Sequence, residues 1–342
     1  MQFRIRVPIV FGLLMVCCVS SASAQINALP GSCCRSYSDT EPYYDVDRLT
    51  TGCYRDTGPC WLGQSSIDLL LLGRSDADSR TIVTEAGTGN PLLNTADLGF
   101  PVAAGFRANL VLPGANGCDL VFNYLGAKFD NSRVNSAATA RYDFFEFPAL
   151  APSAGTSFQT SYTSTLNSVE VNGRLRQWCR FAPLAGFRFI QLGDEFNRLS
   201  GDGTSDLLLS TTGNQLWGFQ IGGEALLCDW GAFRLQSTTK AGVFVNHLTL
   251  DTGGGSITVP MFDPMASFST NHAAFFGEVN LELAYRVGPH FSIRVGGTAM
   301  WLDGVALAPD QHDNFNLQTQ VGTFDFGTVM YYGGYLGGEF TW

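Results

Sequence analysis

The sequence ends in Tyr335-Leu336-Gly337-Gly338-Glu339-Phe340-Thr341-Trp342, and this stretch is the most informative part of the chain. Aromatic residues occupy the last position and the position two before it, and a glycine lies three further back. Aromatic rings are favoured where the hydrocarbon of a bilayer meets the headgroups. The pattern therefore predicts a strand that closes a β-barrel within a membrane. An exposed hydrophobic tail on a soluble domain is the alternative.

The same ending resembles the C-terminal insertion signal of bacterial outer-membrane β-barrels, which finishes in Phe or Trp. The residues that match this signal are Gly337, Phe340 and Trp342. The resemblance implies that the barrel-assembly machinery is a partner, through the C-terminal strand, and that the barrel contacts outer-membrane lipid.

The N-terminus has the three parts of a secretory signal peptide. Arg4 and Arg6 supply positive charge, residues 7–19 form a short apolar core, and residues 22–24 provide small residues for cleavage before Gln25. We assign residues 1–24 to a cleaved signal. A lipoprotein signal fits less well, because the bulky Val16 precedes the adjacent cysteines.

The rest of the chain is rich in glycine and aromatic residues and contains only two lysines, Lys128 and Lys240. No later segment has the unbroken apolar run that a membrane-spanning helix needs. Short alternating stretches separated by turn residues are typical of a transmembrane β-barrel. A soluble β-sandwich remains the alternative fold.

One predicted hairpin shows the alternation clearly. From Phe275 to Val287 every second residue is apolar or small, and charged and polar residues such as Glu278 and Glu282 lie between them. After a turn at residues 288–290, the alternation resumes from Phe291 to Trp301. Successive side chains of a strand point to opposite faces. One face is thus suited to lipid and the other to a wet interior.

Similar patterns predict about ten strands within residues 61–342, and ten is an even number, as single-chain bacterial barrels require. Short turns are expected near 113–117, 179–183, 229–232 and 288–290. Long loops are expected near 76–98, 130–163, 199–213, 252–272 and 305–328. This alternation of short turns and long loops along the chain predicts an all-β antiparallel up-and-down barrel with short periplasmic turns and long outer loops. Twelve strands stay possible, because a long loop could contain another hairpin. The opening strand fits least well, because it places leucine on both faces.

The tryptophans give a second indication of the same topology. Trp61, Trp178, Trp230 and Trp342 fall at predicted periplasmic ends, whereas Trp217 and Trp301 fall near predicted outer ends. We interpret them as two aromatic girdles at the bilayer interfaces.

Residues 25–60 do not join the strand pattern, and we interpret them as a Cys-rich periplasmic extension. Beyond the signal the chain has seven cysteines: Cys33, Cys34, Cys53, Cys60, Cys118, Cys179 and Cys228. Export to an oxidising compartment permits disulfides. We hypothesise a bridge from the extension to a cysteine at a periplasmic turn. Local pairing, such as Cys53 with Cys60, is equally allowed, and metal binding lacks the usual spacing.

Charged residues recur on the predicted inner face. The basic ones are Arg107, Arg174, Arg176, Arg188, Arg234, Lys240, Arg286 and Arg294, and the acidic ones include Asp68, Glu170, Glu224, Glu278, Glu282 and Glu339. They predict either a charged lumen that sorts small polar solutes or an ion-pair network that fills a narrow barrel. We favour the filled barrel.

Enzymatic alternatives have little support in the sequence. His290-Phe291-Ser292 has the His-x-Ser spacing of outer-membrane phospholipases, but its surroundings differ from that family. Outer-membrane proteases use Asp and His pairs near the outer rim, where His247, His272 and His312 are expected, with Asp251 and Asp313 nearby in sequence. We interpret these residues as ordinary polar residues. The acidic outer loops are likewise interpreted as a solvated surface, and we expect no catalytic residues, metal or cofactor. The net charge of −10 argues against nucleic-acid binding.

Taken over nearly the whole mature chain, these features resemble the beta-barrel porin-seven family of planctomycete-type bacteria. The features that match are the signal peptide, the Cys-rich lead, Trp61-Leu62 before the first strand, the glycine-rich strands and the ending Gly337 to Trp342. The resemblance implies a porin, so we expect a passive outer-membrane channel for small solutes or ions. A structural or surface-interaction barrel without an open pore is the alternative, and an outer-membrane hydrolase is a further one.

Overall fold

The computed structural model describes residues 63–77, 79, 81–85, 88, 90–114, 117–136, 140–142, 157–175, 180–201, 207–255, 266–311, 315–316 and 321–342. The predicted signal peptide, the Cys-rich extension, Trp61, Trp178 and Arg176 lie outside these residues. Among the described residues there is no helix of the length and apolarity that crossing a membrane requires.

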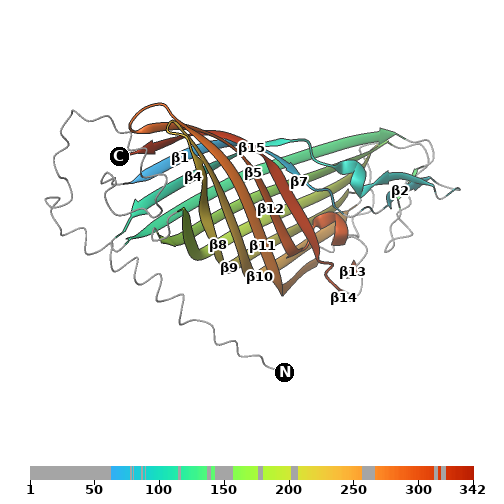
Figure 1. Cartoon of the computed structure of the whole chain (residues 1–342). Helices are drawn as coiled ribbons and strands as arrows, with labels where there is room; N and C mark the ends of the chain where they lie inside the picture. The colour runs from blue at the N-terminus through green and yellow to red at the C-terminus, as the bar shows by residue number, and fades with distance from the viewer. Residues whose placement is uncertain are drawn as a thin grey trace, which may run out of the picture.

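Ten antiparallel strands form a closed barrel, so the ten-strand prediction is confirmed (Figure 1). They are β1 (Gln64–Arg74), β4 (Ala103–Pro113), β5 (Cys118–Ser136), β7 (Ser157–Leu175), β8 (Phe181–Gly201), β9 (Leu207–Asp229), β10 (Phe233–Gly255), β11 (Ala266–Arg286), β12 (Phe291–Val305) and β15 (Gly327–Thr341). Sequence neighbours pair in every case, and β15 pairs with both β12 and β1.

The last strand closes the barrel, as its sequence predicts. β1 and β15 pair along their length, and the ladder continues to the final residue, because Gly63 and Trp342 exchange two backbone hydrogen bonds at 3.3 and 3.1 Å. Closure matters because it leaves neither terminal strand with an unpaired edge.

Smaller elements lie beyond one end of the barrel, where Figure 1 shows β2, β13 and β14. A three-stranded sheet contains β2 (Thr81–Glu85), β3 (Pro91–Asn94) and β6 (Ala140–Tyr142), and a short ladder joins β13 (Phe315–Asn316) to β14 (Val321–Gly322). Two 3₁₀ helices, η2 (Thr95–Leu98) and η5 (Ala308–Gln311), complete the described elements. We call the end of the barrel that carries β2, β13 and β14 the loop end, and the opposite end the short-turn end.

Several strands are longer than the sequence pattern predicts. Much of the expected loops 130–163, 199–213 and 252–272 belongs to β5, β7, β8, β9, β10 and β11, so those loop boundaries are wrong. The reason is visible on β9. Its outward residues run Ile221, Phe219 and Trp217, and then change to polar Gln215, while the pairing with β8 and β10 continues. Where water rather than lipid covers the outside of a strand, its outward residues need not be apolar, but its backbone hydrogen bonds continue.

The exterior of the barrel carries an apolar band. Outward side chains such as Ile67, Ile221 and Leu336 are 58–69% exposed. On a soluble protein a continuous belt of this kind would be unfavourable. Around a closed barrel it is the surface that hydrocarbon covers, so these strands span a bilayer. Trp217 and Trp301 lie at the loop-end limit of the band, and Trp230 and Trp342 lie at the short-turn end.

Candidate functional site

The interior of the barrel is divided into layers along its axis. From the short-turn end to the loop end, the inward positions of β8 are Leu184, Gly186, Arg188, Ile190, Leu192, Asp194 and Phe196. Charge thus gives way to apolar side chains, and then polar groups return. The same order holds on neighbouring strands, so the lumen has a charged part, an apolar layer and a second polar part.

The charged part surrounds a cavity of about 1140 Å³, which we call the vestibule. Its lining includes Gln64, Thr341 and the turn residues 231–232 and 287–290, so it opens at the short-turn end. Of the charged residues predicted from sequence to face inward, those lining it are Arg107, Glu170, Arg174, Glu224, Arg234, Lys240, Glu278, Glu282, Arg286, Arg294 and Glu339. Arg188 lies buried just behind the lining, against Glu278.

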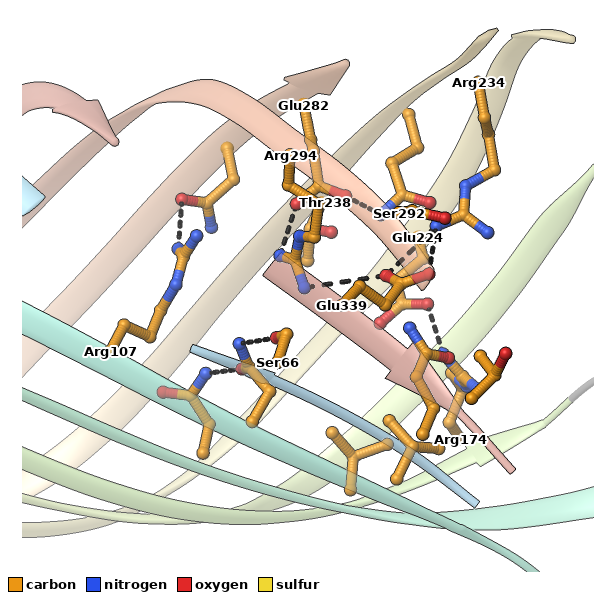
Figure 2. Close-up of a pocket in the computed structure, with 18 of the residues that line it drawn as sticks. Ser66, Arg107, Arg174, Glu224, Arg234, Thr238, Glu282, Ser292, Arg294 and Glu339 are labelled. Atoms are coloured by element: carbon orange, nitrogen blue, oxygen red, sulfur yellow. Dashed lines mark hydrogen bonds and ion pairs between the residues drawn. The ribbon is translucent and has the colours of Figure 1, made fainter. Parts of the chain in front are cut away.

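Most charges of the vestibule are paired across strands. Near the mouth, Arg174 contacts Asp119 at 2.9 Å and Glu224 at 2.8 Å. Arg234 contacts Glu339 at 3.1 Å. Figure 2 shows these groups converging, with Arg294 between Glu282 and Glu339.

The inner end of the vestibule holds a tighter cluster. Arg188 lies 2.6 Å from Glu278 and 3.6 Å from Glu170, and Lys240 pairs with Glu170 at 2.5 Å. Gln220 also donates to Glu170. Because isolated charges are costly to bury, this degree of pairing is what allows them to remain inside the barrel.

Several members of these networks are neutral or acidic residues outside the set of inward charges that the sequence predicts. Asp119 binds Arg174, Asn280 accepts from Arg107 at 3.3 Å, and the Tyr335 ring lies 4.1 Å from the Arg107 guanidinium. A rule that counts every inward polar position, rather than only charged ones, would have found Asn172, Gln220 and Asn280.

An apolar layer closes the vestibule from the loop end, and we call it the septum. It contains Leu70, Leu72, Leu125, Phe129, Leu166, Ile190, Leu192, Leu216, Phe244, Phe276, Met300, Leu302, Val329 and Tyr331. Seven of these, Leu70, Leu72, Phe129, Leu192, Leu216, Val329 and Tyr331, have 0% exposed surface. Atoms that line an open pore must contact water, so no water-filled path passes these side chains.

The last residue of β12 and the chain that follows it fold inward and add to the septum. Val305, Ala306, Leu307 and Ala308 are buried, and Val305 and Leu307 pack in the apolar cluster. Asn214 holds this segment through two hydrogen bonds with Ala306: its Nδ2 donates to the carbonyl at 2.8 Å, and its Oδ1 accepts from the backbone N–H at 2.9 Å. We call residues 305–311 the plug.

Beyond the septum, a buried polar cluster joins distant strands. Arg74 of β1 contacts the Asp194 carboxylate of β8 at 2.9 Å, and the Tyr162 hydroxyl donates to the same carboxylate at 2.6 Å. β1 and β8 are not neighbours in the barrel. The cluster therefore braces the lumen across its width.

The three described histidines have their contacts with amide, aromatic and backbone groups. His247 Nδ1 lies 2.9 Å from Asn271 Oδ1, His272 stacks on Phe326, and His290 Nδ1 lies 2.9 Å from the Thr341 carbonyl. His312 and Asp313 lie outside the described residues. Within the described ranges, no group of three or more His, Cys, Asp or Glu side chains is placed to hold a metal ion.

The cysteines are partly described. Cys118 is disulfide-bonded, and Cys228, the other described cysteine, is free. The partner of Cys118 therefore lies outside the described residues, and the bridge between the extension and the barrel rim stays a prediction.

Comparisons with known proteins give weak structural likenesses. No family model matches the sequence, and no curated protein matches it. The Escherichia coli outer membrane protease OmpT is similar at 10% identity, covering 82% of this chain and 96% of that one, with a TM-score of 0.44. The Pseudomonas putida toluene transporter TodX is similar at 8% identity, covering 82% and 89%, with a TM-score of 0.29. At these values neither likeness bears on what this chain does.

Proposed function

We propose that this chain is an integral outer-membrane β-barrel whose lumen is closed to through-diffusion in its resting state, with a vestibule that opens toward the periplasm. The septum carries this proposal, because its side chains are at most 4% exposed and seven of them have no exposed surface, although they occupy the centre of the lumen. The cell-surface orientation follows from the short turns, which bacterial barrels place on the periplasmic side.

The location and processing belong to the same proposal. It includes a cleaved signal peptide at residues 1–24, contact with outer-membrane lipid, and recognition of Gly337, Phe340 and Trp342 by the assembly machinery. The last of these is consistent with the closed β15–β1 seam, which reaches Trp342. Membership of the beta-barrel porin-seven family is supported by the sequence features alone.

Planar-bilayer recording of the purified mature chain tests the closed state. We expect no stepwise ionic conductance from the wild type. A variant with a thinned septum, Phe129→Ala with Phe276→Ala, should conduct, because it removes two large rings from the closed layer. Stepwise conductance from the wild type at low voltage would contradict the proposal.

A porin-like passive channel is the second candidate, and the vestibule favours it, because a cavity of about 1140 Å³ already occupies the periplasmic part of the lumen. A channel of this kind would need the septum and plug to move. The ion selectivity of that conductance should then change when Arg174 and Arg176 are replaced by Glu, because Arg174 lines the vestibule and Arg176 is predicted from sequence to face the lumen. Absence of conductance under all voltages would leave the structural or surface-interaction barrel.

A further inference from the structure

We propose that the vestibule is a binding site for small oxyanions, that is, solutes bearing a carboxylate or a phosphate. This inference deepens the proposed function, because it names the kind of solute that the periplasm-facing cavity takes. It depends on the vestibule walls and is independent of whether the septum opens.

The first observation concerns which partner of each ion pair faces the cavity. Arg107 is 6% exposed and its partner Asp68 is 0% exposed. Arg234 is 33% exposed against 4% for Glu339, and Lys240 is 9% exposed against 1% for Glu170. In each of these three pairs the cation is the more exposed partner, so the pair presents mainly its N–H groups to the cavity. The carboxylates of Glu170, Glu278, Glu282 and Glu339 also line the vestibule.

Glu278 and Glu224 reverse this order. Glu278 is 4% exposed against 1% for Arg188. Glu224 is 28% exposed, whereas Arg174, its partner, is 13% exposed. Glu224 of β9 lies near the mouth between Arg174 of β7 and Arg234 of β10, so one carboxylate stands between these two cations. The exposed Arg286 also lines the vestibule and adds a further cation to the mouth.

The second observation concerns buried polar atoms that lack a partner. Among the described residues that line the vestibule, these atoms are Asn172 Nδ2, Arg174 Nε, Arg234 Nε and Arg294 Nε. All four are donors. Asn172 is only 1% exposed, and its Oδ1 already accepts from Gln220, so its amide N–H groups are the part left unpaired. Buried donors without acceptors are unfavourable. Because these four atoms have almost no surface exposed to the cavity, a solute reaches them only when the side chains turn toward it.

Donor-rich walls match an acceptor-rich solute. Carboxylate and phosphate oxygens accept several hydrogen bonds at once, and guanidinium groups bind them in paired, charge-assisted contacts. The hydroxyl groups of a neutral sugar donate hydrogen bonds as well as accept them, so a sugar would leave part of the N–H donors of the wall without an acceptor. The net charge of the whole chain is −10, so anion binding here must come from local geometry and not from overall attraction.

Isothermal titration of the full mature chain in a non-ionic detergent tests the site, with inorganic phosphate and succinate as probes and glucose as the neutral comparison. We expect saturable binding of both anions and none of glucose. Arg234→Gln and Arg286→Gln should each weaken binding roughly tenfold, since each removes one charge-assisted contact. Arg234→Gln should still fold, because Glu339 keeps Arg294 at 3.6 Å.

Lys128→Gln provides the matched control. Lys128 is 63% exposed and pairs with Asp130 on the outward side of β5, so its loss removes one positive charge without touching the vestibule. Binding should be unchanged in this variant. Equal weakening in Lys128→Gln, equal binding of glucose, or no saturable anion binding by the wild type would each overturn the assignment. Conductance by the wild type would refute the closed barrel and leave the anion site standing.

Discussion

Gly337 illustrates at the scale of a residue how one position serves two purposes. The sequence predicts that it belongs to a C-terminal insertion signal. In the barrel it is an inward residue of β15 opposite Asp68 of β1, and a Cβ there would overlap the Asp68 carboxylate. Asp68 in turn holds Arg107 at 2.9 Å and lies 3.6 Å from Arg294. The glycine thus makes room for an ion pair at the closing seam.

We expect Gly337→Val to destabilise the folded barrel by about 3 kcal/mol, because the new side chain displaces a buried carboxylate from its partners. Gly334→Ala is the control. Its added Cβ meets nothing closer than the Gly296 carbonyl at 3.5 Å. Denaturant titration followed by tryptophan fluorescence measures both. Equal stability of the two variants would show that the space beside Asp68 is unimportant.

Arg188 is the second residue whose removal should have a defined effect. Arg188→Met leaves Glu278 buried beside Asn280 without its cation, which should cost about 3 kcal/mol. The double variant Arg188→Met with Glu278→Leu removes both charges and should recover most of that loss. A double variant no more stable than the single one would mean that the pair does not account for the cost.

At the scale of elements, β1 shows where the sequence pattern was correct and where it lacked information. Alternation predicts a strand here, but leucine on both faces makes it the poorest fit. The structure explains the exception: Leu69 and Leu71 face the lipid, whereas Leu70 and Leu72 enter the septum. Two different apolar environments on the two sides of one strand cannot be distinguished by hydrophobicity alone.

The plug lies within residues 305–328, which the sequence pattern predicts to be a long outer loop. Its inward course depends on Asn214, which is distant in sequence, so no local pattern could predict it. Asn214→Ala should release the plug and increase backbone hydrogen exchange across residues 305–311, because both hydrogen bonds between Asn214 and Ala306 are lost. Gln215→Ala, one residue along and facing outward, should leave exchange unchanged. Equal exchange in both variants would show that Asn214 does not hold the plug in place.

At the scale of the whole molecule, the barrel could be predicted, with its apolar outside and its polar inside. The reason is that the alternation of side chains can be recognised within a single strand. The septum could not be predicted, because nine of the ten strands each contribute only one or two side chains to it. The inward charges were likewise predictable as a set, but their pairing depends on the stagger between strands.

A closed barrel should resist unfolding by detergent until it is heated. We expect the unboiled mature chain to migrate faster than the boiled chain in gel electrophoresis, because every strand is paired on both sides. Circular dichroism of the unboiled sample should be rich in β-structure. Identical migration, with good solubility in the absence of detergent, would favour the soluble sandwich.

The length of the strands has a consequence for how this protein meets its surroundings. β9 continues from Trp217 to Leu207 after its lipid-facing side chains end. At about 3.3 Å per residue and a tilt of about 40°, that length raises the wall roughly 25 Å above the hydrocarbon. The barrel strands from β5 to β11 are similarly long, whereas β1, β4, β12 and β15 are shorter. In the proposed orientation, a phage, an antibody or a neighbouring cell would first encounter a stiff partial collar on one side of the barrel, standing clear of the headgroups. Such a collar offers a surface of fixed shape for recognition.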